Sequence, residues 1–165
     1  MGGYHSDSDS QVVQSFRGAI TQFVYFGKPA YFNGSVYFCG TGNSLKQFQI
    51  SNAKLETSPR SQTVAQFDYP GCVPTISANG KADAIVWLLE STGVLRAYDP
   101  ANLSNELYDS NQVATRDALG TYVKFSVPIV ANGKVYAGTQ DALVAYGLLP
   151  RAMVSPPGTN PTAPH

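Results

Sequence analysis

The residues with the clearest capacity for chemistry lie in "ATRDALGTYVKF", where Arg116, Asp117 and Lys124 interrupt an otherwise charge-poor sequence. The simplest role for Arg116 is an ion pair with Asp117 that stiffens a loop. The functional alternative is a polar rim on a binding face, because loops held by a rigid scaffold often carry binding residues. We therefore take these three residues as candidate binding residues, and we identify no catalytic residue.

Patterns for metal binding and for a serine nucleophile are weak. His5 and His165 lie near the two ends of the chain, which does not favour a histidine metal site. Asp7 and Asp9 have the alternating spacing of part of a calcium loop, but the glycine and the closing glutamate of such a loop are missing. No G-x-S-x-G motif is present. The sequence therefore predicts no metal site.

Two cysteines and a single tryptophan complete the candidates. Cys39 and Cys72 are either two small buried apolar side chains or the two halves of one disulfide. Two cysteines alone do not establish an oxidising compartment. Trp87 follows two β-branched residues in an apolar run, so we expect it to be buried and structural.

The composition limits the partners that the chain can have. Charged residues make up 13% of the sequence, and 11 basic residues balance 11 acidic ones. No basic face is implied, which argues against nucleic acid and against an anionic membrane surface. No apolar run reaches the length of about 18 residues that a transmembrane helix needs. The first residues, "MGGYHSDSDSQ", also lack the pattern of a signal peptide.

Three segments with one shared pattern must position these residues: Pro29–Ile50, Pro74–Asp99 and Pro128–Leu149. Each reads as a strand, an Asn-Gly turn, a second strand, a polar turn and a third strand. The Asn-Gly pairs supply the positive φ angles that a tight hairpin needs. They are Asn33-Gly34, Asn79-Gly80 and Asn132-Gly133.

The spacing of the repeats predicts the fold. The leading prolines lie 45 and 54 residues apart, and each repeat contains several short strands. This pattern is typical of propeller blades, whereas helical repeats would need an apolar period of 3.6 residues. We predict an all-β fold, a partial β-propeller of about three four-stranded antiparallel blades.

An outer strand should follow each repeat. Residues 64–67 fit that position after the first repeat, and Leu107–Tyr108 fit it after the second. No strand-like segment follows the third, so the N-terminal "SQVVQSFRG" is a candidate to supply the missing strand.

Two local departures from the repeat are expected. Residues 81–84, "KADA", read as a loop insertion in the middle repeat. One short helical turn is predicted near Pro100–Glu106, with Asp99 as its N-cap and proline at the first helical position.

The pattern "VPxVANGKVYxGTxxxLxAYGLL", preceded by "TRDALGTYVKF", resembles the C-terminal blades of bacterial pyrroloquinoline quinone-like repeat proteins, in the quinoprotein alcohol dehydrogenase-like superfamily. "YPGCVPTISANG" and "VLRAYDPANLSNELYDSNQ" are similar to the preceding blade. The resemblance covers roughly residues 4–150. It implies an extracytoplasmic, periplasmic or secreted propeller protein. Most such proteins have no assigned activity, so we expect a non-enzymatic scaffold or binding module without a cofactor.

The alternative is a fragment of a quinoprotein-type oxidoreductase, which would use pyrroloquinoline quinone with calcium. The dehydrogenases of that group have a tryptophan floor, acidic and amide calcium ligands, an aspartate base and an adjacent Cys-Cys ring. This chain departs from that set, because Trp87 lies in a strand and Cys39 and Cys72 are not adjacent.

The expected organisation has three parts: residues 1–28 with the possible closing strand, blades over 29–150, and a Pro/Gly-rich linker or disordered tail over 151–165. An arc of about three blades leaves two apolar faces open. The expected partners are therefore further propeller blades, if the chain is a fragment, or identical chains that complete a ring.

Overall fold

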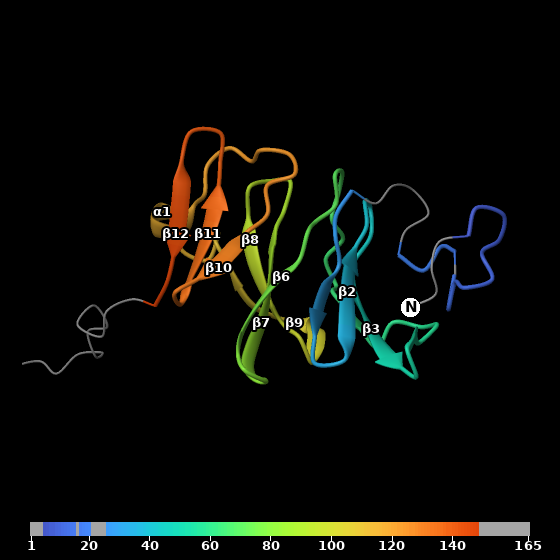
Figure 1. Ribbon diagram of the computed structural model, residues 1–165. Helices are drawn as coiled ribbons and strands as arrows, with labels where there is room; N and C mark the ends of the chain where they lie inside the picture. Colours follow the sequence, from blue (N-terminus) through green and yellow to red (C-terminus); the bar gives the residue numbers. More distant parts are fainter. Residues whose placement is uncertain (1–4, 16, 21–25, 149–165) are drawn as a thin grey trace, which may run out of the picture.

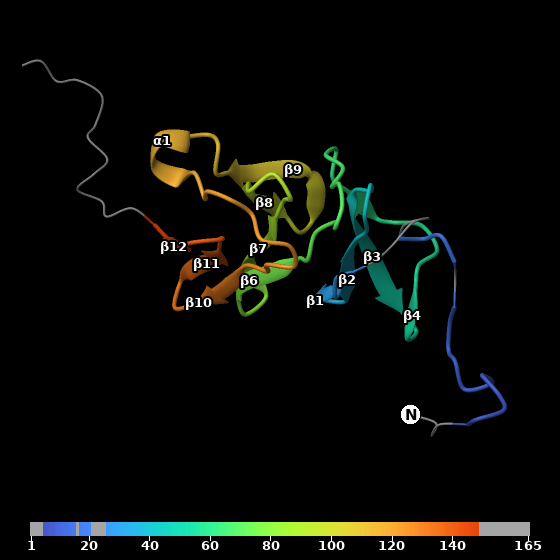
Figure 2. The ribbon, with the colours of Figure 1, turned by 90° about the horizontal axis from the view of Figure 1, so that it is seen from above.

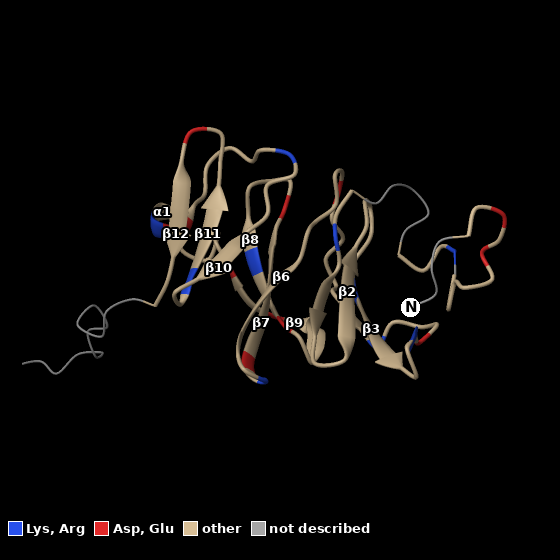
Figure 3. Cartoon of the chain, viewed as in Figure 1, with Lys and Arg blue, Asp and Glu red and all other residues tan. Residues whose placement is uncertain are grey.

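The computed structural model describes residues 5–15, 17–20 and 26–148 (Figure 1). Over these ranges the chain is all-β, as predicted, and its strands form antiparallel sheets. Charged residues are scattered along the ribbon (Figure 3). No helix in the described part is long and apolar enough to cross a membrane.

Three sheets follow one another along the chain, and each begins with a hairpin. The first sheet consists of β1 (Ala30–Phe32), β2 (Ser35–Cys39), β3 (Leu45–Ser51), β4 (Lys54–Leu55) and β5 (Ser61–Gln62). The second consists of β6 (Thr75–Asn79), β7 (Ala82–Leu89), β8 (Leu95–Asp99) and β9 (Asn102–Asp109). Helix α1 (Ala114–Asp117) leads to the third sheet, which consists of β10 (Ile129–Ala131), β11 (Lys134–Gly138) and β12 (Leu143–Tyr146).

The three sheets stand face to face, and the first and second sheets also contact one another through β5 and β9. Strand β6 contacts β1 on one side and β10 on the other, and the view from above shows the sheets spreading outward from these strands (Figure 2). Paired residues of antiparallel strands share a face. On the second sheet Val86 and Tyr98 therefore face the first sheet, while Trp87 and Ala97 face the third.

Two apolar clusters fill the spaces between the sheets. The cluster between the first and second sheets contains Tyr37, Cys39, Leu45, Phe67, Cys72, Val86, Leu88, Tyr98 and Leu103. The cluster between the second and third contains Leu89, Leu95, Leu119, Val135 and Ala137. The second sheet is thus covered on both faces, which explains its nearly continuous apolar β7.

The structure pairs Cys39 with Cys72 in a disulfide. Of the two alternatives for these cysteines, the disulfide is therefore the one observed. Cys39 ends β2, and Cys72 lies in the segment that leads into β6. Their Cα atoms are 5.3 Å apart. The bridge therefore joins the first sheet covalently to the start of the second.

The Asn-Gly turns form as predicted in the first and third sheets. Asn33 (φ 44°) and Gly34 (φ 80°), like Asn132 (φ 50°) and Gly133 (φ 68°), have the two positive φ angles of a tight hairpin turn. In the middle sheet the insertion prediction is wrong. Most of "KADA" belongs to β7, which begins at Ala82 after a register shift opposite Ser77–Asn79.

The helical turn predicted at Pro100–Glu106 is also wrong. The Ala101 amide donates to Asp99 Oδ1 at 2.8 Å, so the aspartate closes a local turn in place of capping a helix. Strand β9 starts at Asn102 and buries Leu103 completely. The helix that does form is α1, further along the chain.

The outer strands are confirmed in one sheet and differ in another. Leu107 and Tyr108 lie in β9, the fourth strand of the second sheet. Residues 64–67 form no strand, because the chain adds β4 and β5 earlier and Phe67 makes only an isolated bridge to Asn43.

The N-terminal segment does not complete the third sheet of its own chain. Gln14 lies beside β4, where its side chain accepts from the Leu55 amide at 2.7 Å and donates to the Leu55 carbonyl at 2.9 Å. The described residues from 10 to 15 contain no strand, and residue 16 of the expected closing strand lies outside the described residues.

Candidate functional site

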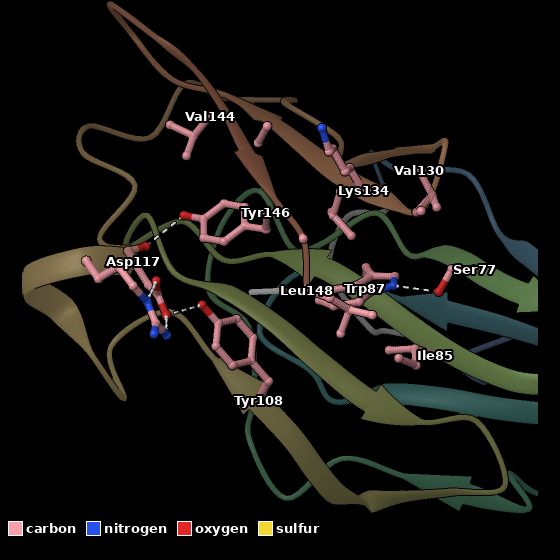
Figure 4. Close-up of a pocket in the computed structure, with 15 residues that line it drawn as sticks. Ser77, Ile85, Trp87, Tyr108, Asp117, Val130, Lys134, Val144, Tyr146 and Leu148 are labelled. Atoms are coloured by element: carbon pink, nitrogen blue, oxygen red, sulfur yellow. Dashed lines mark hydrogen bonds and ion pairs between the residues drawn. The ribbon is translucent and has the colours of Figure 1, made fainter. Parts of the chain in front are cut away.

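A cleft of about 510 Å³ opens between the second and third sheets. One wall comes from β7 and β9, the other from β11, β12 and the turn between β10 and β11, and α1 closes one end (Figure 4). Its floor is apolar and aromatic, with Ile85, Trp87, Val130 and Val144. Arg116 and Asp117 lie at the α1 end, and Lys134 lines the cleft from the start of β11.

Trp87 is the largest side chain in the floor of this cleft. The sequence predicts a buried, structural residue: it packs against the cluster between the second and third sheets, but it is only partly buried. Its indole Nε1 donates to Ser77 Oγ at 2.9 Å, a bond from β7 to β6 (Figure 4). The hydrogen bond fixes the ring while one part of it stays open to the cleft.

The charged end of the cleft is organised around Asp117. Arg116 donates to both carboxylate oxygens, from Nε to Oδ1 at 2.5 Å and from Nη2 to Oδ2 at 2.7 Å. The Tyr108 hydroxyl donates to Oδ2 at 2.9 Å. The carboxylate is buried while Arg116 is half exposed, so the guanidinium covers the aspartate on the solvent side.

Tyr146 connects this end of the cleft to the third sheet. Its hydroxyl donates to the Asp117 carbonyl at 2.7 Å, so β12 is held to α1 (Figure 4). Burial, followed by the nearby charge of Asp117, raises the pKa of Tyr146 to about 12. Burial and the hydrogen bond to Asp117 likewise raise the pKa of Tyr108. Both tyrosines are therefore neutral at physiological pH.

The Arg116 guanidinium and the Tyr108 hydroxyl hold the pKa of the Asp117 carboxyl below its ordinary value, against the opposing effect of burial. A carboxylate with this pKa is a poor proton acceptor near neutral pH. Both of its oxygens already have partners. The geometry thus suits a rigid binding surface better than proton transfer.

The structure brings two of the three predicted binding residues together. Arg116 and Asp117 line the cleft, whereas Lys124 lies elsewhere, with its Nζ 5.0 Å from the centre of the Tyr69 ring. Lys124 therefore contacts an exposed cluster of aromatic side chains, in which Phe26 packs on Tyr69 and on Phe125.

The sequence analysis missed Tyr108 and Tyr146. Tyr108 lies in β9 and Tyr146 in β12, so the two hydroxyls reach Asp117 from different sheets. Their identity as tyrosines rather than phenylalanines was the available signal, since a hydroxyl at a strand position calls for a partner.

In the part of the chain that the structure describes, the side chains that a quinone and its calcium would need are not brought together. The half-cystine pair Cys39–Cys72 belongs to the cluster between the first and second sheets, while Trp87 faces the third sheet. Among the described residues no group of three or more His, Cys, Asp or Glu side chains is placed to hold a metal ion.

No protein-family model matches the chain, and comparison with curated proteins and with solved structures finds no match.

Proposed function

We propose that the chain is a segment of a β-propeller that acts as a non-enzymatic scaffold or binding module in a larger extracytoplasmic assembly. The support is the equivalence of the three sheets. Ala30–Tyr37–Gln47, Thr75–Trp87–Ala97 and Ile129–Tyr136–Ala145 are paired in the same register across the first three strands of each sheet.

One observation carries the proposal: the third sheet offers to solvent the face that its two predecessors bury. Leu45 and Leu95 hold the same position in the first and second sheets, and both are 0% exposed. Leu143 holds that position in the third sheet and is 73% exposed. A further sheet packed on this face would bury it in the same way.

The edge of the third sheet supports the same conclusion. The second sheet has four strands, whereas the third has three among the described residues, with β12 at its edge. An unpaired edge strand is a template for another strand. Further blades of a longer chain or an identical chain would supply both the missing strand and the next sheet.

The cleft between the second and third sheets is the proposed binding surface of the module. Trp87 gives it an aromatic floor and the Arg116–Asp117 pair gives it a rigid polar end. Aromatic and arginine side chains are the ones most enriched at binding hot spots. The buried disulfide is compatible with the proposed extracytoplasmic location.

Sedimentation and light scattering of the purified chain, over a range of concentrations, test the proposal. We expect association, or binding of a dye that reports exposed apolar surface. A compact monomer at high micromolar concentration without dye binding would contradict the open arc. Reduction of a redox dye by alcohol after addition of pyrroloquinoline quinone and calcium would contradict the non-enzymatic role.

A further inference from the structure

A second cleft, of about 550 Å³, opens between the first and second sheets. It lies at the position equivalent to the first cleft, between the turn side of one sheet and the next sheet along the chain. Its volume falls within the range of small-molecule sites, roughly 300–1,000 Å³. Unlike the first cleft it is lined mainly by polar side chains, including Ser35, Gln47, Gln49, Arg60, Asp83 and Asp99.

The repeat shows that the fold does not require this polarity. Gln47 is paired with Tyr37, and the equivalent residues of the second and third sheets are Ala97 and Ala145. A small apolar residue therefore suffices where the sheet has only to pack against its neighbour. The first sheet instead buries an amide, which costs free energy unless all its polar atoms find partners.

Gln47 is not fully satisfied by the protein. Its side chain is only 6% exposed, and Nε2 donates to Ser35 Oγ at 3.0 Å and to the Tyr37 hydroxyl at 3.4 Å. Oε1 is buried and has no hydrogen-bond partner. Buried side-chain oxygens without a partner are uncommon in folded proteins. Gln47 lines the cleft, so a ligand bound there is a candidate donor to this oxygen.

The opposite wall comes from the hairpin between β6 and β7. Lys81, Asp83 and Ala84 line the cleft from this hairpin, and Asp83 has φ 53°, a conformation that non-glycine residues seldom adopt. The register shift in the hairpin brings these residues to the cleft. The departure from the repeat thus builds a wall of the second cleft.

The charges around the cleft cancel. Arg60 and Lys81 are cationic, Asp83 and Asp99 are anionic, and Arg60 Nη1 donates to Gln49 Oε1 at 2.9 Å. Phe32 adds apolar surface to this polar lining. A lining with both donors and acceptors, no net charge and some aromatic surface is complementary to a neutral ligand rich in hydroxyl groups.

We propose that the cleft between the first and second sheets binds a neutral polyhydroxylated ligand of the sugar class, with a ligand hydroxyl donating to Gln47 Oε1. This inference does not depend on how the propeller is completed. Ligand hydroxyls both donate and accept, so they match the amides and the carboxylates of the cleft together. A small ion would satisfy only one sign of charge.

The full chain, titrated with glucose, galactose and mannose and followed by two-dimensional amide NMR, tests the proposal. We expect at least one sugar to shift signals confined to the cleft, including those of Gln47, Asp83 and Ala101. Acetate and ammonium ions serve as charged probes and should leave these signals unchanged. No response to any of the three sugars, or a response to the ions alone, would overturn the inference.

The decisive variant is Gln47→Leu, which keeps the size of the side chain and removes the acceptor. Loss of one hydrogen bond to the ligand should weaken sugar binding about tenfold. The melting temperature should change little, because removal of the unpartnered buried oxygen offsets the loss of the two hydrogen bonds from Nε2. Gln112→Leu, an exposed glutamine outside the cleft, is the matched control and should bind as the parent does.

If Gln47→Leu fails to fold, Asp83→Asn at the exposed hairpin provides the second test. We expect it to weaken sugar binding severalfold without changing the melting temperature. Unchanged affinity in either folded variant would show that the sugar does not occupy this cleft.

Discussion

Trp87 both stabilises the fold and lines the cleft between the second and third sheets. Its ring packs on the cluster between the second and third sheets, and its nitrogen is tied to Ser77. Because the side chain is only partly buried, we expect Trp87→Ala to cost about 2–3 kcal/mol of unfolding free energy, below the value for a fully buried tryptophan. Denaturant unfolding measures this cost.

Trp87→Phe provides the control, since it keeps an aromatic ring and removes the bond to Ser77 Oγ. It should cost about 1 kcal/mol, the usual net contribution of one hydrogen bond. Equal losses in the two variants would show that the hydrogen bond, and not the ring, stabilises this position.

Asp117 predicts a pH dependence of stability. Its folded pKa is depressed, with the hydrogen bond from Arg116 as the main cause. The stabilisation is therefore complete above the ordinary aspartate pKa of about 4 and is lost as the pH falls through the lower folded value. The melting temperature of the parent should fall below that pH more steeply than that of Asp117→Asn. Parallel curves in acid would contradict this assignment.

Part of the site could be predicted from the sequence because its residues are neighbours. Arg116 and Asp117 form the pair that their adjacency indicates, and α1 brings both to the cleft. Lys124 could not be placed, since its position depends on how the loop before β10 meets Tyr69. The mixed alternation of β3 places Gln47 and Gln49 on the face of Leu45, but a sequence does not show which face a neighbouring sheet will cover.

At the scale of elements, the turn between β7 and β8 packs directly against the segment that leads to the third sheet. Gly93 has φ +83°, and a Cβ there would lie 2.6 Å from the Gly120 carbonyl oxygen in the segment leading to the third sheet. Gly93→Ala therefore combines a left-handed backbone with a clash against main chain. We expect it to cost about 3 kcal/mol of unfolding free energy.

Gly133→Ala is the matched control in the third sheet, with φ +68° and nothing within 4 Å of the added Cβ. Its cost should be about 1 kcal/mol, from the backbone alone. Thermal and denaturant unfolding of both variants compare these costs. A Gly133→Ala variant as unstable as Gly93→Ala would show that the carbonyl contact contributes nothing.

The elements that could be predicted are those whose local chemistry and tertiary contacts agree. Asn33-Gly34 and Asn132-Gly133 turn because both residues accept positive φ, whatever surrounds them. Asp99 was misread because an aspartate before a proline serves a helix cap and a turn equally well. Leu103 is buried against the first sheet, and this contact favours the strand over the helix. The contact lies between residues far apart in the sequence, so a local pattern does not reveal it.

At the scale of the whole molecule, the disulfide links the first sheet covalently to the segment that leads into the second. Cys39 and Cys72 are separated by 33 residues along the chain. A loop of that length implies about 3–4 kcal/mol of stabilisation, chiefly through the unfolded state. Unfolding in the presence and absence of a reductant should differ by this amount. Alkylation of the native oxidised chain should modify neither cysteine, and modification without reductant would contradict the bridge.

The last prediction concerns association through the open face of the third sheet. Ile129 and Leu143 are 63% and 73% exposed on this face. The equivalent face of the second sheet is covered by the third sheet. If a further sheet or an identical chain packs there, a charge on the face must oppose association, because burying an unpaired lysine is costly. We expect Leu143→Lys to shift the chain toward monomer in sedimentation and light scattering, with the melting temperature of the monomer unchanged.

Val64→Lys is the control for charge alone, since Val64 is 85% exposed and lies in the segment after β5. It adds the same lysine to an equally accessible apolar position away from the third sheet. Its association should match that of the parent at every concentration. Equal dissociation by both lysines would mean that net charge, and not the face that carries Leu143, controls assembly. If Leu143→Lys leaves association unchanged, the chains associate through another surface. The main support for a ring closed through the third sheet would then be lost.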